Sequence, residues 1–167
     1  MNRFIWRIVL YWSVATGLAV GSEADLQLQD RALIGEMLAQ YSYRWDGKDS
    51  VGFAELFTED GAMERWVSGA QVDGSVVRGR ANIFDYARRS HLGRLADRQT
   101  RHHFTGLVFK ELSESHAVTE NMALITHQTA GNPPAVASSG IYRISWRKTD
   151  QGWRMAQRVL FTDRFDP

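Results

Sequence analysis

The chain has no cysteine. Disulfide bonds, zinc sites with thiolate ligands and a lipid anchor on cysteine are therefore excluded. Its formal net charge is only +1, and no run of lysine and arginine stands out, so we expect no nucleic-acid partner. At 167 residues, of which 44% are hydrophobic, the composition is that of a single globular domain with a proper core.

Long apolar runs are also scarce. The uncharged, largely apolar segment 8–21 is shorter than the roughly 20 residues that a membrane-spanning helix needs. It follows a segment with two arginines and no acid, and small residues come after it, which is the layout of a secretory signal peptide. We expect residues 1–24 to be a signal peptide and residues 25–167 to be a mature domain, exported to the periplasm or secreted, without stable membrane insertion. The alternatives are a short uncleaved anchor and a false leader from a mis-assigned start codon.

Helical periodicity dominates the first half of the chain. Asp30 is a plausible N-cap, and Asp46-Gly47 is the expected end of the first helix. Its apolar stripe, at spacings of three and four, consists of Leu33, Ile34, Met37, Leu38, Tyr41 and Trp45. A short second helix is predicted to bury Val51, Phe53, Ala54, Leu56 and Phe57. Residues 80–92 form the third predicted helix.

Strands dominate the second half. A turn at 58–61 precedes a strand at 62–67, and 71–78 is a short strand or a loop. Longer strands are predicted at 102–112, 117–127, 139–148 and 152–162, with a loop at 129–137. Helices followed by a long antiparallel meander predict an α+β fold, in which the helices pack on one face of a curved sheet.

The two strands at 102–112 and 117–127 flank a polar turn at 113–116, which sets their register. The predicted pairs are Leu112 with Ala117, Val108 with Asn121, Gly106 with Ala123, Phe104 with Ile125, and His102 with His127. Opposed residues share one face, so a mostly apolar face ends in two histidines. This is an arrangement typical of a site, although it is also compatible with a pair of structural histidines, and a single bulge would change the pairing.

Three segments carry a family resemblance: YSYRWDGKDSVGFAELFTEDGAM, RHHFTG and DQGWRMAQR. They resemble the SnoaL-like and scytalone-dehydratase-like group of the nuclear-transport-factor-like superfamily, over about residues 25–163. The resemblance implies a curved antiparallel sheet wrapped around N-terminal helices as a cone with an internal pocket. That fold hosts dehydratases, isomerases, cyclases, dehydrochlorinases and non-catalytic binders, so fold alone does not give the function.

The resemblance to scytalone dehydratase also implies site residues. Asp46 matches the aspartate that follows a helix-ending tyrosine, although Trp45 stands where that tyrosine would be. His102, with His103 as the second choice, matches the first active-site histidine, and His127 matches the second. Near Ile141 and Arg143 the polar residues of the family are replaced, but Arg143 resembles an arginine used late in the chain by bile-acid dehydratase.

The implied chemistry is a cofactor-independent lyase reaction, the dehydration of a small hydrophobic cyclic substrate of polyketide, steroid or terpenoid type. His102 would be the base, oriented by Asp46, and His127 would hold the leaving hydroxyl or the carbonyl oxygen. Residues expected to bind substrate are Tyr43, Trp45, Trp66, Phe104 and Arg143. The family also implies a homo-oligomer, a dimer or trimer, that forms through the outer face of the sheet.

Other interpretations of the same residues stay open. An isomerase would use the same aspartate–histidine pair, and a non-catalytic binder would use the same cone. Asp46, His102 and His127 also form a two-histidine, one-carboxylate set, but the resemblance implies metal-free chemistry, so we expect no metal. If these residues have structural roles only, Asp46 would cap a helix end, and Trp45 and Trp66 would be core residues. Arg143 and Arg158 would then form outward ion pairs.

Overall fold

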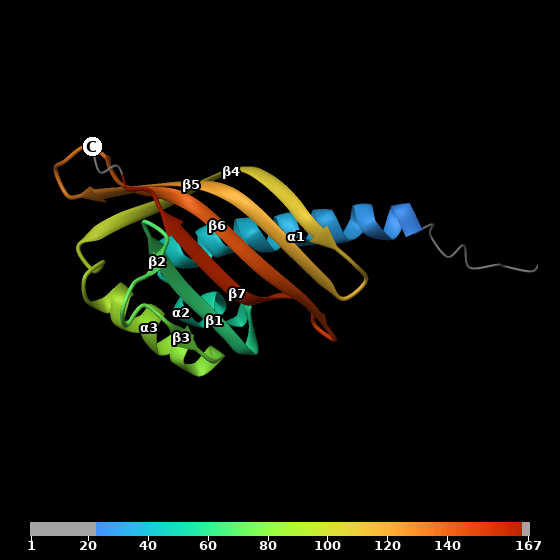
Figure 1. Ribbon diagram of the computed structural model, residues 1–167. Coiled ribbons are helices and arrows are strands. Elements are labelled where there is room, and N and C mark those ends of the chain that lie inside the picture. Colours follow the sequence, from blue (N-terminus) through green and yellow to red (C-terminus); the bar gives the residue numbers. More distant parts are fainter. Residues whose placement is uncertain (1–22, 165–167) are drawn as a thin grey trace, which may run out of the picture.

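The computed structural model describes residues 23–164, which form one curved sheet wrapped around a long helix (Figure 1). The helices are α1 (Glu23–Asp46), α2 (Ser50–Glu55) and α3 (Arg80–Leu92). The strands are β1 (Phe57–Val67), β2 (Ala70–Gln71), β3 (Val77–Arg78), β4 (Arg98–Leu112), β5 (His116–Thr129), β6 (Ala135–Thr149) and β7 (Gly152–Thr162). The predicted α+β fold with a curved, mainly antiparallel sheet is confirmed.

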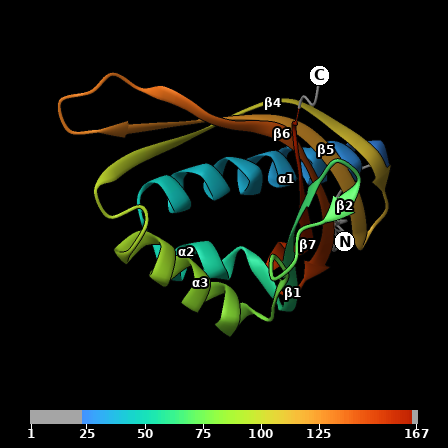
Figure 2. The same ribbon diagram turned by 60° about the vertical axis from the view of Figure 1, so that its left-hand side comes forward.

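The sheet has the order β2-β1-β7-β6-β5-β4, with β3 paired to β1. Figure 2 shows α1 inside the curve of the sheet, while α2 and α3 lie on the open side. Only one of the observed pairs departs from the predicted antiparallel meander, because β1 runs parallel to β7. The first and the last strand of the chain therefore differ from the predicted order along the sheet only in that β1 lies beside β7. As a result β1 lies inside the sheet, between β2 and β7.

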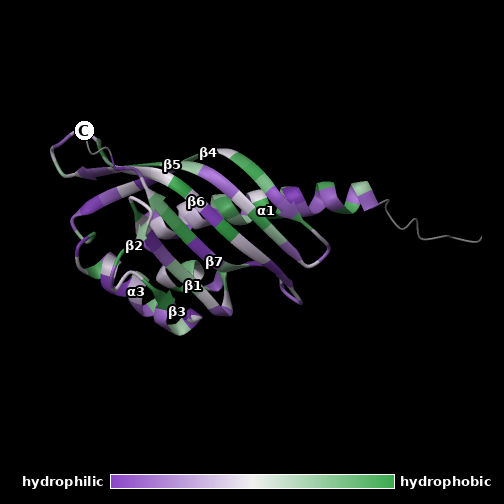
Figure 3. Ribbon diagram, in the orientation of Figure 1, coloured by the Kyte–Doolittle hydropathy of each residue, from purple (hydrophilic) through white to green (hydrophobic). Residues whose placement is uncertain are grey.

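Burial explains why these segments fold together. The largest fully buried side chains come from α1, α2, α3 and the inner face of the sheet, and they include Ile34, Phe53, Phe57, Ile83, Ile144, Trp146, Trp153 and Met155. Along β5 and β6 hydrophobic and hydrophilic residues alternate, as Figure 3 shows, because successive side chains point to opposite faces of the sheet. The predicted bounds of α3 and β7 agree with the structure.

The first helix ends at Asp46, as predicted, but begins earlier than predicted. It starts at Glu23, so Asp30 is no N-cap but a buried residue in the helix interior. Its carboxylate accepts hydrogen bonds from Trp153 Nε1 at 2.8 Å and from Lys148 Nζ at 2.8 Å, which ties α1 to the last hairpin. At the C-terminal end the residue with a left-handed backbone is Lys48, with φ of 59°, rather than Gly47. Two residues predicted to be buried, Leu33 and Val51, are 45% and 58% exposed.

Two loops were predicted too long. Residues 58–61, predicted as a turn, belong to β1, where an irregularity between Phe57 and Ala62 bends the strand. The predicted loop at 129–137 is shortened to residues 130–134, since β5 continues to Thr129 and β6 begins at Ala135. At Ala135 and Val136 the pairing with β5 outweighs the local turn signals, whereas residues 58–61 lie within the irregularity and have no register partner on β7.

The β4–β5 hairpin shows why register could not be taken from the turn alone. Leu112 pairs with Ala117 as predicted. Two irregularities in β4 then insert one extra residue each, so Phe104 pairs with Ala123, His102 with Ile125, and Thr100 with His127. The predicted His102–His127 pair is therefore wrong. Two shifts of one residue together restore the predicted alternation of inward and outward side chains, however, so both histidines still face the inside of the sheet.

Between the two irregularities the inward-facing and outward-facing residues of β4 are exchanged. Val108, predicted to face inward, is 53% exposed, and its neighbours Leu107 and Phe109 pack against the core instead. Gly106 marks the first irregularity with a φ of +64°, a conformation that side chains with a Cβ rarely adopt.

The predicted signal peptide lies outside the described residues, apart from Glu23 and Ala24, which open α1. Within residues 23–164 no helix is both long and apolar enough to cross a membrane.

Candidate active site

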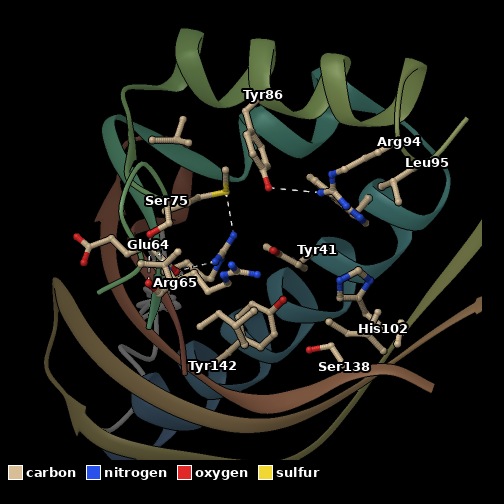
Figure 4. Close-up of a pocket in the computed structure, with 18 of the residues that line it drawn as sticks. Tyr41, Glu64, Arg65, Ser75, Tyr86, Arg94, Leu95, His102, Ser138 and Tyr142 are labelled. Carbon is tan, nitrogen blue, oxygen red and sulfur yellow. Dashed lines mark hydrogen bonds between the residues drawn. The ribbon is translucent and has the colours of Figure 1, made fainter. Parts of the chain in front are cut away.

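A cavity of about 560 Å³ opens between the inner face of the sheet, the second half of α1 and the end of α3. Its walls come from elements far apart in the sequence: Tyr41 and Trp45 on α1, Tyr86 on α3, His102 on β4, His127 on β5, and Tyr142 on β6. Figure 4 shows Tyr41, Tyr86, His102 and Tyr142 around one shared space. A concave, mainly apolar space with a few polar groups is the usual form of a small-molecule site.

Asp46 and His102 meet at the wall of this cavity. Nδ1 of His102 lies 2.8 Å from Oδ1 of Asp46, and both side chains are only 6% exposed. His102 lines the cavity and Asp46 lies behind it. Because the carboxylate accepts a hydrogen bond from Nδ1–H, Nε2 carries the free lone pair, and within residues 23–164 no protein group bonds it.

Three further hydrogen bonds fix Asp46 in this position. Thr100 Oγ1 donates to Oδ1 at 2.6 Å, and the backbone N–H of His102 donates to Oδ2 at 2.8 Å. Gln99 Nε2 donates to the backbone carbonyl of Asp46 at 2.8 Å. The end of α1 is thus bound to β4 at Gln99, Thr100 and His102, which makes the aspartate–histidine geometry rigid.

The carboxylate stays ionised. Burial alone would raise the pKa of Asp46, but the hydrogen bonds and the positive charge of His102, together with Thr100, outweigh burial and lower it. An ionised carboxylate behind the ring can go on accepting the Nδ1–H hydrogen bond while Nε2 takes up a proton, as a general base requires.

His127 lines the same cavity but belongs to no such pair. Burial lowers its pKa, and the positive charges of Arg98 and Arg94 lower it further. A neutral imidazole at this position can accept or donate one hydrogen bond to a ligand.

The structure separates the two candidate bases. His103 points to the other face of β4, where its Nε2 lies 3.3 Å from Thr126 Oγ1, and it is absent from the cavity wall. Successive strand residues face opposite sides, so only one of the adjacent histidines can reach the cavity.

Of the residues predicted to bind substrate, only Trp45 lines the cavity. Phe104 packs one layer behind, with its ring 5.9 Å from that of His102 and 5.2 Å from that of Tyr142. Trp66 does not reach the cavity but donates to Glu64 Oε2 at 3.2 Å. Its role is to help hold a residue of the wall rather than to touch a ligand.

Tyr43 and Arg143 were predicted to bind substrate, and this prediction is wrong. Tyr43 is 77% exposed, because it lies off the buried stripe of α1. Arg143 points to the outer face of β6, where its guanidinium forms an ion pair with Glu120 at 2.6 Å. Neither side chain is part of the cavity wall.

The cavity instead uses two residues that local patterns did not indicate, Tyr142 and Arg158. Tyr142 is the inward neighbour of Arg143 on β6. Arg158 faces inward because Ser145 pairs with Gln157 and Trp146 with Met155, which leaves Ala156 as an extra residue on β7. The extra residue reverses the alternation of faces that begins at Trp153. Arg158, which was predicted to form an outward ion pair, therefore lies in the cavity wall and is only 8% exposed.

Arg158 is held among aromatic rings. Its guanidinium carbon lies 5.3 Å from the ring centre of Tyr142 and 6.0 Å from that of Tyr41. Nη1 donates to the backbone carbonyl of Glu64 at 3.0 Å, while the buried Nε has no partner among the described residues. Burial raises the pKa of both Tyr41 and Tyr142, so their hydroxyls remain protonated donors.

Within residues 23–164 no three histidine, aspartate or glutamate side chains converge as metal ligands. Asp46, His102 and His127 therefore do not form the three-ligand set that their types allow.

The profile of the SnoaL-like domain matches residues 26–159, so the chain belongs to the SnoaL-like domain family. A solved aspartate-to-asparagine variant of Rv3472, a protein of unknown function from Mycobacterium tuberculosis, is 32% identical, with a TM-score of 0.74 over 88% of this chain and 79% of that one. No protein of curated function matches the sequence.

Two solved proteins from Novosphingobium aromaticivorans have the same fold. An NTF2-like protein with a cystatin-like fold is 25% identical, with a TM-score of 0.71 over 86% of this chain and 88% of that one. A protein named as a candidate scytalone dehydratase is 23% identical, with a TM-score of 0.69 over 84% of this chain and 89% of that one. These neighbours confirm the resemblance to the nuclear-transport-factor-like and scytalone-dehydratase-like group.

Proposed function

We propose that this protein is a cofactor-independent lyase that removes water from a hydrophobic cyclic β-hydroxy carbonyl compound. One observation carries the proposal: Asp46 holds Nδ1 of His102 at 2.8 Å and leaves Nε2 directed to a cavity lined by aromatic side chains. A base that is oriented from behind and open in front suits the abstraction of a proton from carbon.

The reaction has two steps. Nε2 of His102 takes the proton α to the substrate carbonyl, and the electrons of the C–H bond form an enolate. The enolate then re-forms the carbonyl as the bond between the β carbon and its hydroxyl breaks. The proton on His102 joins the leaving hydroxide, so the products are an unsaturated carbonyl compound and one water, and the enzyme is returned to its starting state.

Charge on the enolate oxygen needs donors that are already in place. Arg158 supplies a fixed positive charge in the cavity wall, and its Nε–H has no partner in the described part of the chain. Tyr41 and Tyr142 add protonated hydroxyls, whose pKa burial raises. In this proposal Arg158 contacts the substrate in place of Arg143, which was expected to bind it, and His127 holds the leaving hydroxyl.

The cavity supports the substrate class. A volume of about 560 Å³, with Trp45, Ile125 and Leu160 among its walls, has room for a fused-ring compound. A structural neighbour named for scytalone dehydratase is consistent with a compound of that kind.

An isomerase is the second candidate, because it needs the same oriented base but returns the proton to another carbon. A non-catalytic binder would need the cavity but no buried carboxylate held by His102 and Thr100. The three activities differ in what happens to the α proton and to the hydroxyl.

The test is incubation of the purified protein with a bicyclic β-hydroxy ketone in D₂O, followed by NMR. We expect an alkene product, and a rate at least about 100-fold lower for His102→Gln and Asp46→Asn, the range that general base catalysis supplies. His103→Gln is the matched control, since it removes an imidazole from the opposite face of β4.

The outcomes separate the candidates. Deuterium uptake at the α carbon without loss of water would indicate an isomerase. Binding without deuterium uptake, or equal rates for His102→Gln and wild type, would overturn the lyase proposal.

Export remains a proposal as well. Expression of the full chain in a bacterial host and sequencing of the N-terminus should find a mature protein that starts at Asp25; an intact N-terminus in the cytoplasm would contradict it.

A further inference from the structure

Arg94 is a cation at the cavity for which the proposed chemistry has no use. It follows Gly93, where α3 ends, and it is exposed while it also lines the cavity, so it lies at the mouth. Within residues 23–164 its guanidinium has no carboxylate partner. Its contacts are two long ones from Nη2, at 3.4 Å to Ser90 Oγ and at 3.4 Å to Tyr86 Oη, the second of which is drawn in Figure 4.

The backbone around Arg94 is firmly held. The N–H of Gly93 donates to the carbonyl of Arg89 at 3.0 Å, and the N–H of Leu95 donates to that of Ser90 at 3.0 Å. Leu95 is 3% exposed and anchors the turn in the core. An arginine on a fixed backbone, whose Nη1 and Nε bond no group of the part of the chain that the structure describes, is suited to bind a planar anion in a bidentate manner.

The charges around the cavity leave room for an anion. Arg158 is a second cation, nine-tenths buried, and its Nε bonds nothing among residues 23–164. Glu64 is the buried acid of the wall, but Trp66, Gln71 and Gln157 already donate to its carboxylate. At the rim, Asp73 and Arg65 carry opposite charges.

We propose that the compound bound in this cavity is a hydrophobic ring carboxylate, whose carboxylate is held by Arg94 at the mouth while its ring lies on Trp45 and Tyr86. This inference rests on the proposed function for the identity of the cavity as the substrate site. It narrows the substrate from hydrophobic cyclic compounds in general to those with a permanent negative charge at one end. It also sets the orientation, with the charged end at the mouth and the carbonyl inside, near His102.

The test compares two probes that differ only in charge, 2-naphthoate and 2-naphthamide, by isothermal titration calorimetry on the full protein. We expect naphthoate to bind about tenfold more tightly than naphthamide, because a charge-assisted bidentate contact is stronger than a neutral one. Arg94→Gln should remove this preference, and Arg94→Lys should restore part of it. Arg88→Gln is the control, since it removes the same charge from the exposed face of α3 and from no part of the cavity wall.

Three results would overturn the inference: equal affinity of wild type for both probes, no binding of either, or an equal loss of preference in Arg88→Gln. Binding needs no turnover, so the result is independent of the lyase assay. An unchanged naphthoate preference in His102→Gln, combined with no elimination by wild type, would sink the lyase proposal and keep the carboxylate site.

Discussion

Oδ1 of Asp46, at the last residue of α1, accepts a hydrogen bond from Nδ1 of His102, on β4, at 2.8 Å. The two residues are far apart in the sequence, and the contact joins the C-terminal end of a helix to the inner face of the sheet. The same carboxylate binds Thr100 and the backbone of His102, so any change at Asp46 affects both the orientation of the ring and the attachment of the helix.

The hydrogen bond between Asp46 and His102 should fix the tautomer of His102. In wild type above neutral pH, Nδ1 should carry the proton and Nε2 should be bare, because the carboxylate accepts from Nδ1. Two-dimensional ¹⁵N–¹H spectra of the histidine side chains report which nitrogen is protonated. Asp46→Ala should remove the preference for Nδ1–H and lower the free energy of unfolding by about 1–3 kcal/mol, since Thr100 and the His102 backbone lose their acceptor.

An unchanged tautomer in Asp46→Ala would show that Asp46 does not orient the ring. The spectrum of His103, on the opposite face, is the internal control and should not change.

Acid should destabilise the fold through His91. This residue is 3% exposed, and its pKa is lowered by burial and by the positive charges of Lys48 and Arg94. The unfolded chain binds a proton at about pH 6.5 and the folded protein only at lower pH, so the free energy of unfolding falls as the pH drops below about 6.5. His127, whose pKa is also lowered, adds to the effect in the same direction.

Urea denaturation at about pH 8 and about pH 5.5 measures this loss, and a single histidine contributes at most about 1.4 kcal/mol per pH unit. His91→Phe keeps an aromatic ring beside Trp45 but cannot be protonated, so its stability should depend less on pH. An equal pH dependence in the variant would assign the effect to other groups.

Two glycines should respond in opposite directions to alanine. Gly35 lies inside α1, and a Cβ there would meet Leu107 at an ordinary 4.0 Å, so Gly35→Ala should stabilise the protein by about 0.5–1 kcal/mol. Gly106 has a φ of +64°, and a Cβ there would lie 2.9 Å from Met122 Cε. The methionine can move but the backbone strain stays, so Gly106→Ala should cost about 1–2 kcal/mol.

Urea denaturation of both variants measures the difference. A neutral Gly106→Ala would mean that the irregularity in β4 does not need glycine, and the structural account of the register would fail.

The outer face of the sheet is the expected self-association surface. Met122 is 57% exposed and pairs in register with Ile141, which is 42% exposed, and Leu124 is 42% exposed beside them. We propose that this face forms a homodimer, since exposed apolar side chains that are contiguous mark association sites. Sedimentation velocity should find a dimer for wild type and a monomer for Met122→Glu.

Leu28→Glu is the control for that experiment, because Leu28 is 68% exposed on α1 and lies away from the sheet. A wild-type monomer, or a dimer that survives Met122→Glu, would contradict the proposal, and a trimer would need another surface.

The sequence by itself determined the features that depend on neighbours along the chain. The spacing of apolar residues predicted α3 and β7 with their observed bounds, the polar turn predicted the Leu112–Ala117 pair, and the family resemblance pointed to Asp46 and His102. Helical periodicity and strand alternation are local properties, because each follows from the backbone geometry of one element.

Only the tertiary structure decided which strand residues face the cavity. Extra residues in β4 and β7 shift the alternation, and they arise from pairing with partner strands rather than from any local pattern. For that reason Arg158 points inward. On β6 the alternation is regular from Tyr142 to Trp146, so the cavity receives Tyr142 while Arg143 pairs with Glu120 outside. A strand has a period of two, so one inserted residue exchanges its two faces, and the chemistry of the cavity depends on that exchange.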